Sequence, residues 1–111
     1  MDLVGSVEGK DCIIIDDMID TAGTLIEACK ALKDNGAASV VACATHPVFS
    51  GPAIERITKS DALNKVLVTN TIPLSKEAQE SGKIISVSVA DILAKSIHRT
   101  FNNDSVSSLF L

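Results

Sequence analysis

Short apolar runs rich in β-branched residues alternate along this chain with segments whose apolar residues recur at helical spacing. The first run, Asp11–Asp16, sets four apolar residues between acidic ones and is typical of a buried strand in a parallel sheet. The segment Thr24–Asn35 follows, with apolar residues three or four apart, lysines toward its end and Gly36 just beyond it. This order predicts a strand, a loop and a helix.

The same alternation continues toward the C-terminus. We expect further strands at Ser39–Thr45, Lys65–Thr69 and Lys83–Val87. We expect short helices after Gly51-Pro52 and over Ser75–Ser81. Strands that alternate with helices at these lengths predict right-handed crossovers. The predicted fold class is therefore α/β, with a mostly parallel sheet and flanking helices, in one domain over residues 1–111 without a linker.

A last helix is predicted after Ser88, which forms a possible capping box with Asp91. Its apolar side chains are expected to pack into the core; these are Val89, Ile92, Leu93 and Ile97. The final stretch, 102–111, is polar and then apolar, so it is either a frayed tail or a segment that docks on a partner.

Composition excludes some classes of function. With 111 residues the chain is long enough for one core, but small for an enzyme that must enclose two substrates. Its net charge of −4 and its three Phe, with no Trp or Tyr, argue against a nucleic-acid partner.

The three cysteines, Cys12, Cys29 and Cys43, are odd in number, widely spaced and set among apolar residues. This pattern favours reduced thiols in the core over disulfides or zinc ligands. The start, residues 1–5, lacks a basic segment followed by an apolar one, and no apolar run is long enough to span a bilayer. We therefore expect a cytoplasmic protein.

The segment between the first strand and the first helix, residues 16–24, carries the candidate site. Ligands of open parallel sheets bind at the carboxyl ends of strands, where loops meet helix N-termini. A phosphate could be held there by the N–H groups at the helix start and by the hydroxyls of Thr21 and Thr24. Gly23 would permit a close approach of the ligand to the backbone, or a positive φ. Asp16, Asp17 and Asp20 would repel a bare anion, but they suit sugar hydroxyls or Mg²⁺. The chemistry indicates a phosphorylated sugar or a nucleotide.

Each of these residues also has a purely structural interpretation. Asp20 or Thr21 could cap the helix, and Gly23 could serve the turn. The run as a whole contains more polar groups than a cap requires. No Walker A or G-x-G-x-x-G pattern is present. His46 follows a predicted strand without an acidic or nucleophilic partner in the sequence, so a structural role is favoured over that of a base.

The segment Ile13–Thr24, IIIDDMIDTAGT, resembles the phosphoribosyl signature shared by type I phosphoribosyltransferases and ribose-phosphate pyrophosphokinases (PRPP synthetases). Three further segments, Ala44–Ala53, Val68–Leu74 and Ser105–Phe110, resemble the PRPP synthetases. This resemblance implies the C-terminal one of two phosphoribosyltransferase-like domains. It also implies a homo-oligomeric transferase of nucleotide biosynthesis that uses ATP and Mg²⁺ to convert ribose 5-phosphate into PRPP and AMP.

The resemblance also implies residue roles. The ribose hydroxyls, and directly or indirectly Mg²⁺, are expected at Asp16 and Asp17. The 5-phosphate is expected on the loop formed by Asp20, Thr21, Ala22, Gly23 and Thr24. A regulatory site for phosphate or ADP, formed between subunits, is expected at Ser105, Ser107 and Phe110, although solvated tail hydroxyls would explain the two serines without the family.

Several parts of the family pattern are not in this sequence. They are the first domain with its pyrophosphate loop, the ATP- and metal-binding histidine region, and the basic loop that stabilises the transferred diphosphoryl group. Because phosphoryl transfer depends on such cations, we assign no catalytic residue and expect the chain alone to be inactive. Two alternatives stay open: a non-catalytic regulatory subunit associated with PRPP synthetase, and a type I phosphoribosyltransferase.

Overall fold

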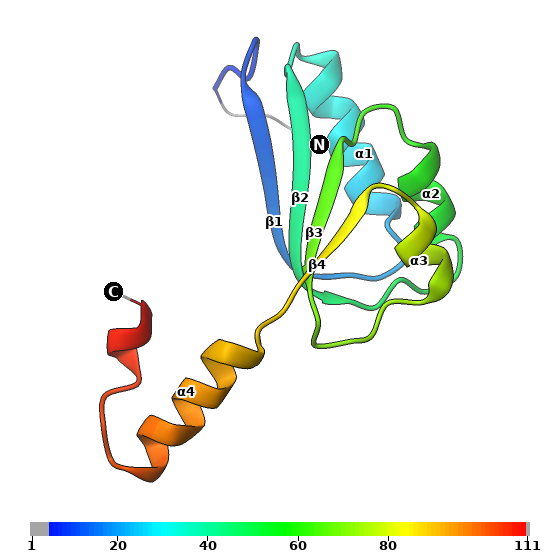
Figure 1. Cartoon of the computed structure of the whole chain (residues 1–111). Coiled ribbons are helices and arrows are strands. Elements are labelled where there is room, and N and C mark those ends of the chain that lie inside the picture. Colours follow the sequence, from blue (N-terminus) through cyan, green and yellow to red (C-terminus); the bar gives the residue numbers. More distant parts are fainter. Residues whose placement is uncertain (1–4, 111) are drawn as a thin grey trace.

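The computed structural model describes residues 5–110, which form a parallel sheet in the order β1-β2-β3-β4 with helices on one face (Figure 1). The fold class predicted from the sequence is confirmed. The elements are β1 (Asp11–Ile19), α1 (Gly23–Asp34), β2 (Ser39–Pro47), α2 (Ala53–Lys59), β3 (Lys65–Thr69), α3 (Lys76–Glu80), β4 (Ile84–Val87), α4 (Ala90–Phe101) and the 3-10 helix η1 (Ser107–Phe110).

The predicted strands and helices are present, and the largest difference in their bounds is at β1. This strand continues three residues past Asp16, because Met18 and Ile19 still pair with His46 and Pro47 of β2. The first helix ends as predicted, with Gly36 at a φ of 92°. No helix within residues 5–110 has the length and apolar character needed to cross a membrane.

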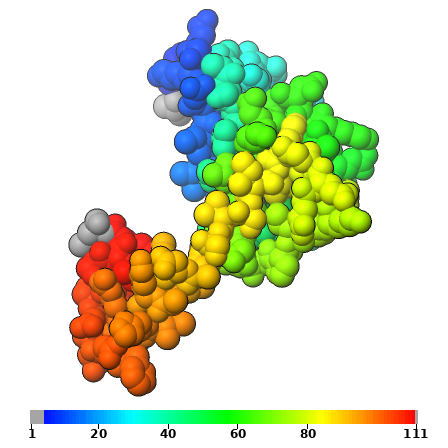
Figure 2. All heavy atoms as spheres, in the orientation of Figure 1, coloured from blue at the N-terminus to red at the C-terminus, as the bar shows by residue number. Residues whose placement is uncertain are grey.

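The prediction that α4 packs into the core is wrong. The helix points away from the sheet and, together with η1, forms a separate arm (Figures 1 and 2). None of its residues is buried, and Ile97 is 70% exposed. The capping box does not close either: the Ser88 hydroxyl accepts a hydrogen bond from the N–H of Ala90 (3.2 Å), whereas Asp91 pairs with Lys95 (3.0 Å).

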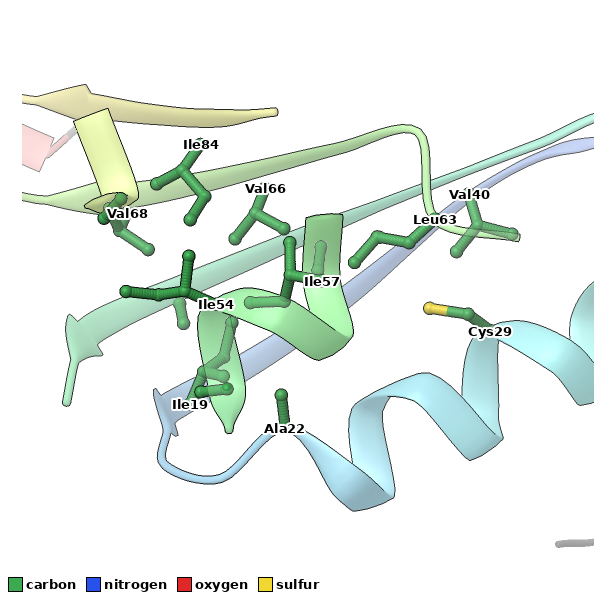
Figure 3. Packing of buried hydrophobic residues seen from close by; sticks show 14 of the residues in the cluster. Ile19, Ala22, Cys29, Val40, Ile54, Ile57, Leu63, Val66, Val68 and Ile84 are labelled. Carbon is green, nitrogen blue, oxygen red and sulfur yellow. The ribbon is translucent and has the colours of Figure 1, made fainter. Parts of the chain in front are cut away.

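The hydrophobic core lies between the sheet and the helices α1 to α3. Val66 and Val68 of β3 lie over Ile54 and Ile57 of α2, whereas Val40 of β2 lies beside Leu63 and faces Cys29 of α1 (Figure 3). Helix α1 adds Cys29 to the same cluster, whereas Cys12 and Cys43 are half-buried, and all three thiols are free. The expectation of reduced core cysteines is therefore confirmed in full for Cys29 alone.

The opposite face of the sheet is exposed within the described residues. Apolar side chains that alternate with the core residues point outward there, and Ile15 is 82% exposed. The prediction of a buried strand is thus wrong for β1, whose residues are mostly exposed. The reason is topological: α1, α2 and α3 all cover the same face of the sheet (Figure 1).

Candidate functional site

A cleft of about 330 Å³ opens where β1 ends and α1 begins. Most of the predicted site residues line it: Asp16, Asp20, Thr21, Ala22, Gly23 and Thr24. Asp17 is next to Asp16 in β1 but is not part of the lining. Apolar residues of the sheet and of α1, such as Ile14 and Leu25, form the rest of the wall. The structure therefore brings the loop residues together around one cavity.

The sharp turn into α1 is made by Ala22. Its backbone is left-handed, with φ 67° and ψ 5°, and its carbonyl accepts the first helical hydrogen bond, from the N–H of Ile26 at 3.0 Å. The expectation of a possible positive φ at Gly23 is wrong, because the left-handed residue is the one before it. Gly23 leaves space for Arg56 instead: a Cβ atom there would lie 3.2 Å from Nη1 of Arg56, so the guanidinium would have to shift.

Three consecutive carbonyls of the turn accept hydrogen bonds from the segment that follows β2. The N–H of Phe49 donates to the carbonyl of Ile19 (3.0 Å), and the N–H of Ser50 donates to that of Asp20 (3.0 Å). Nη1 of Arg56, on α2, donates to the carbonyl of Thr21 (3.1 Å). The carbonyl side of the loop is thus fixed by its neighbours.

The N–H groups of the same loop are free within the described part of the chain. Those of Thr21, Ala22, Gly23 and Thr24 donate to no other residue there, and neither do the hydroxyls of Thr21 and Thr24. Unpaired N–H groups at the start of a helix carry partial positive charge and favour an anion. This arrangement fits a phosphate group, whose oxygens accept several hydrogen bonds at once.

The carboxylates before the loop are exposed. Oδ1 of Asp16 accepts a hydrogen bond from the N–H of Asp17 (2.7 Å). Interaction with the Asp17 side chain, and then with its backbone N–H, lowers the pKa of Asp16. Asp16 is therefore an anion at neutral pH, suited to accept from hydroxyl groups or to bind a hard cation.

The residues present fit Mg²⁺ in part. Within residues 5–110, no group of three or more acidic, His or Cys side chains is arranged to hold a metal ion. Mg²⁺ commonly binds through one or two carboxylates, with waters and substrate oxygens as its other ligands. Asp16 and Asp17 could serve in this way only when a ligand supplies further oxygens.

His46 lies outside the cleft. Its Nδ1 is 2.9 Å from the Thr71 hydroxyl, and the hydroxyls of Thr69 and Thr71 both donate to the carbonyl of Thr45, at 2.6 and 3.1 Å. The histidine therefore belongs to a network of hydroxyl groups between the ends of β2 and β3.

The other predicted residues, at the C-terminus, are placed on the arm. The hydroxyls of Ser105 and Ser107 lie 3.1 Å apart, and Arg99 of α4 donates to the Ser105 carbonyl (3.0 Å) and to the Ser108 hydroxyl. Phe110 is 64% exposed. The predicted site residues thus form two groups, one at the cleft and one on the arm.

Sequence reasoning missed Arg56 and Arg99, each of which reaches one of these two groups. They are the only arginines in the sequence. Their scarcity in a chain of negative net charge is a signal that could have singled them out. No sequence signal indicates that Phe49 and Ser50 anchor the loop through their backbone.

Residues 1–111 match the phosphoribosyl synthetase-associated domain family. The chain belongs to this family. It is 56% identical over 110 residues to a ribose-phosphate pyrophosphokinase of Bordetella pertussis, covering 99% of this chain and 35% of that protein. It is 54% identical over 111 residues to a ribose-phosphate pyrophosphokinase of Wolinella succinogenes, and the match covers 100% of this chain and 35% of that protein.

A solved family structure has the same fold. The crystal structure of phosphoribosylpyrophosphate synthetase from Mycobacterium smegmatis superimposes with a TM-score of 0.84 and 41% sequence identity, covering 90% of this chain and 33% of that one. The resemblance seen in the sequence is therefore confirmed. The chain spans about a third of the length of the relatives it matches.

Proposed function

We propose that this chain forms the ribose-5-phosphate-binding part of a ribose-phosphate pyrophosphokinase and corresponds to its C-terminal phosphoribosyltransferase-like domain. The observation that carries the proposal is the set of free N–H groups from Thr21 to Thr24 at the start of α1. These groups, with the two threonine hydroxyls, receive the 5-phosphate. The lining residue Asp20 completes the loop that holds it.

Asp16 and Asp17 hold the sugar end of the substrate in this proposal. Their carboxylates accept hydrogen bonds from ribose hydroxyls, and they are the residues that would hold Mg²⁺, which would offset phosphoryl charge. The complete enzyme transfers the diphosphoryl group of ATP to ribose 5-phosphate, giving PRPP and AMP. Because no lysine or arginine among residues 5–110 lines the cleft, the cations that stabilise this transfer belong to the rest of the protein, and the chain alone is inactive.

The arm has a separate role in the proposal, as a regulatory site for phosphate or ADP between subunits of a homo-oligomer. The guanidinium of Arg99 donates to the Ser105 carbonyl and the Ser108 hydroxyl, and the hydroxyls of Ser105 and Ser107 lie 3.1 Å apart. This grouping supports the role, since guanidinium and hydroxyl groups bind phosphate oxygens. A cytoplasmic location is consistent with the free thiols.

Calorimetric titration of the complete enzyme tests the substrate site. With Mg²⁺ present, ribose 5-phosphate should bind at least about 100-fold more tightly than ribose, because each charge-assisted hydrogen bond contributes about 1.5–3 kcal/mol. Thr24→Val should weaken binding of ribose 5-phosphate and leave that of ribose unchanged. Asp16→Asn should weaken both. Equal affinities for ribose and ribose 5-phosphate would refute the proposal.

A further inference from the structure

We propose that Arg56 is a positioning residue that holds the phosphate loop in the shape that receives an anion. The inference rests on the proposed function and adds a residue to it. Arg56 belongs to α2, outside the segment that binds the ligand, and its guanidinium contacts the loop at the carbonyl of Thr21.

The geometry of the peptide bond gives the reason. Each peptide unit is planar and trans, so its C=O and its N–H point in opposite directions. The carbonyl of Thr21 and the N–H of Ala22 belong to one such unit. When Arg56 fixes that carbonyl on the α2 side, the N–H of Ala22 must point to the other side, toward the cleft.

Arg56 is the one side chain among the three donors that fix the loop. The carbonyls of Ile19 and Asp20 accept from the backbone N–H groups of Phe49 and Ser50. The third carbonyl, that of Thr21, directly precedes the left-handed residue Ala22, where the backbone is least favourable. Loss of the guanidinium would therefore free the peptide unit that is held against its preference.

The charge of Arg56 also suits this role. Asp16, Asp17 and Asp20 make the surroundings of the loop negative, and among residues 5–110 no other side-chain cation donates to the loop. A guanidinium remains protonated at all relevant pH values. Arg56 forms none of the ion pairs found in the described residues, so a carboxylate does not neutralise it there. Its exposure means that solvent screens part of this contribution.

Gly23 is consistent with the same arrangement. The closest described atom to a Cβ at this position would be Nη1 of Arg56, at 3.2 Å. An alanine there would push the guanidinium away from the Thr21 carbonyl. The glycine thus leaves space for the arginine.

The position of α2 does not depend on Arg56. The buried residues of the helix are Ala53, Ile54 and Ile57. Ile54 and Ile57 pack toward the sheet (Figure 3). Removal of the exposed arginine should therefore leave the fold intact. This separates a positioning role from a purely structural one.

The test uses the complete enzyme and calorimetric titration of ribose 5-phosphate and ribose with Mg²⁺ present. Arg56→Met keeps an unbranched apolar stem and removes the donor and the charge, so it should weaken binding of ribose 5-phosphate by about 10- to 100-fold while binding of ribose stays within about twofold. Arg56→Lys should restore part of the loss. Lys59→Met, which removes another exposed cation of the same helix, is the matched control and should change neither affinity by more than about twofold.

Two outcomes are decisive in different ways. If the unmodified enzyme binds ribose and ribose 5-phosphate equally, the proposed function itself fails. If it prefers ribose 5-phosphate and Arg56→Met retains this preference in full, the function stands and the positioning role is wrong. Equal losses of affinity for ribose 5-phosphate in Arg56→Met and Lys59→Met would also contradict the positioning role. The loss of one positive surface charge would then explain both results.

Gly23→Ala gives an independent test should Arg56→Met fold poorly. If this variant acts by displacing the guanidinium, it should weaken binding of ribose 5-phosphate in the unmodified enzyme and cause a smaller further loss in the Arg56→Lys background. Fully additive losses would overturn the inference.

Discussion

Helices α1 and α4 have the same length, twelve residues, and each carries apolar side chains at helical spacing. Helix α1 buries Ala28, Cys29 and Leu32 against the sheet, whereas α4 buries no residue. Even its apolar residue Phe101 is 86% exposed. Amphipathic spacing therefore identifies a helix with a face to bury, but it does not identify the surface that covers this face.

The N-termini of the two helices also differ, in whether their first N–H groups are free or hydrogen-bonded. The turn into α1 is held by hydrogen bonds to three consecutive carbonyls, which leave its N–H groups free for a ligand. At α4, the first N–H groups are occupied: Asn70 accepts from Val89, and Ser88 accepts from Ala90. A helix start becomes an anion site when neighbouring elements hold its carbonyls and leave its donors unpaired.

The largest expected difference between the helices is in stability. Leu32→Ala on α1 should lower the free energy of unfolding by about 2–5 kcal/mol, because it removes buried methyl groups and leaves a cavity. Ile97→Ala on α4 should change it by no more than about 0.5 kcal/mol, since its side chain is already in water. Urea denaturation of this chain followed by circular dichroism measures both. Similar losses would show that α4 is packed in solution.

Thiol reactivity should separate the helices almost as strongly. Burial raises the pKa of Cys29 on α1, so little thiolate forms and the reagent reaches it only after local opening. In an Ile97→Cys variant, the new thiol on α4 should react with iodoacetamide at least about 100-fold faster than Cys29. Mass spectrometry of the peptides over time gives both rates. Equal rates for Cys29 and the new thiol in the folded Ile97→Cys variant would contradict the burial of Cys29 on α1.

A smaller effect is expected at the turn into α1. Ala22→Val should cost about 1–3 kcal/mol of stability, because a β-branched residue strongly resists a φ of 67°. Ala22→Gly relieves the backbone but loses a buried methyl group, so it should lie within about 1 kcal/mol of the unmodified chain. Thermal denaturation of both variants gives the values. Equal stability of the two variants would argue against the left-handed turn.

The smallest effect concerns the charge before the loop. The pKa of Asp16 lies below its ordinary value of 3.8, through interaction with Asp17. The corresponding stabilisation is present above the unfolded-state pKa and is lost as the pH falls through the folded-state value. Carboxyl chemical shifts followed by NMR during an acid titration should place the Asp16 midpoint below 3.8, and Asp17→Ala should raise it. An unchanged midpoint in that variant would remove Asp17 as the cause.

The sequence by itself predicted the α/β class, the alternation of elements and the residues of the candidate loop. These features depend on local properties: β-branched runs form strands, helical spacing forms helices, and Gly36 ends α1. The segment Lys65–Thr69 was predicted with the bounds that β3 has. Most predicted loop residues line one cleft, because the carboxyl end of a strand and the start of the next helix are adjacent in the chain.

The tertiary structure decided which groups of that loop are free. Phe49, Ser50 and Arg56 are distant in sequence from the loop they anchor, and their contacts depend on how α2 packs beside α1. The left-handed turn at Ala22 also has no local signal, because alanine rarely adopts it. The exposed arm and the open face of the sheet follow from the placement of the covering helices on one side, which periodicity in the sequence does not encode.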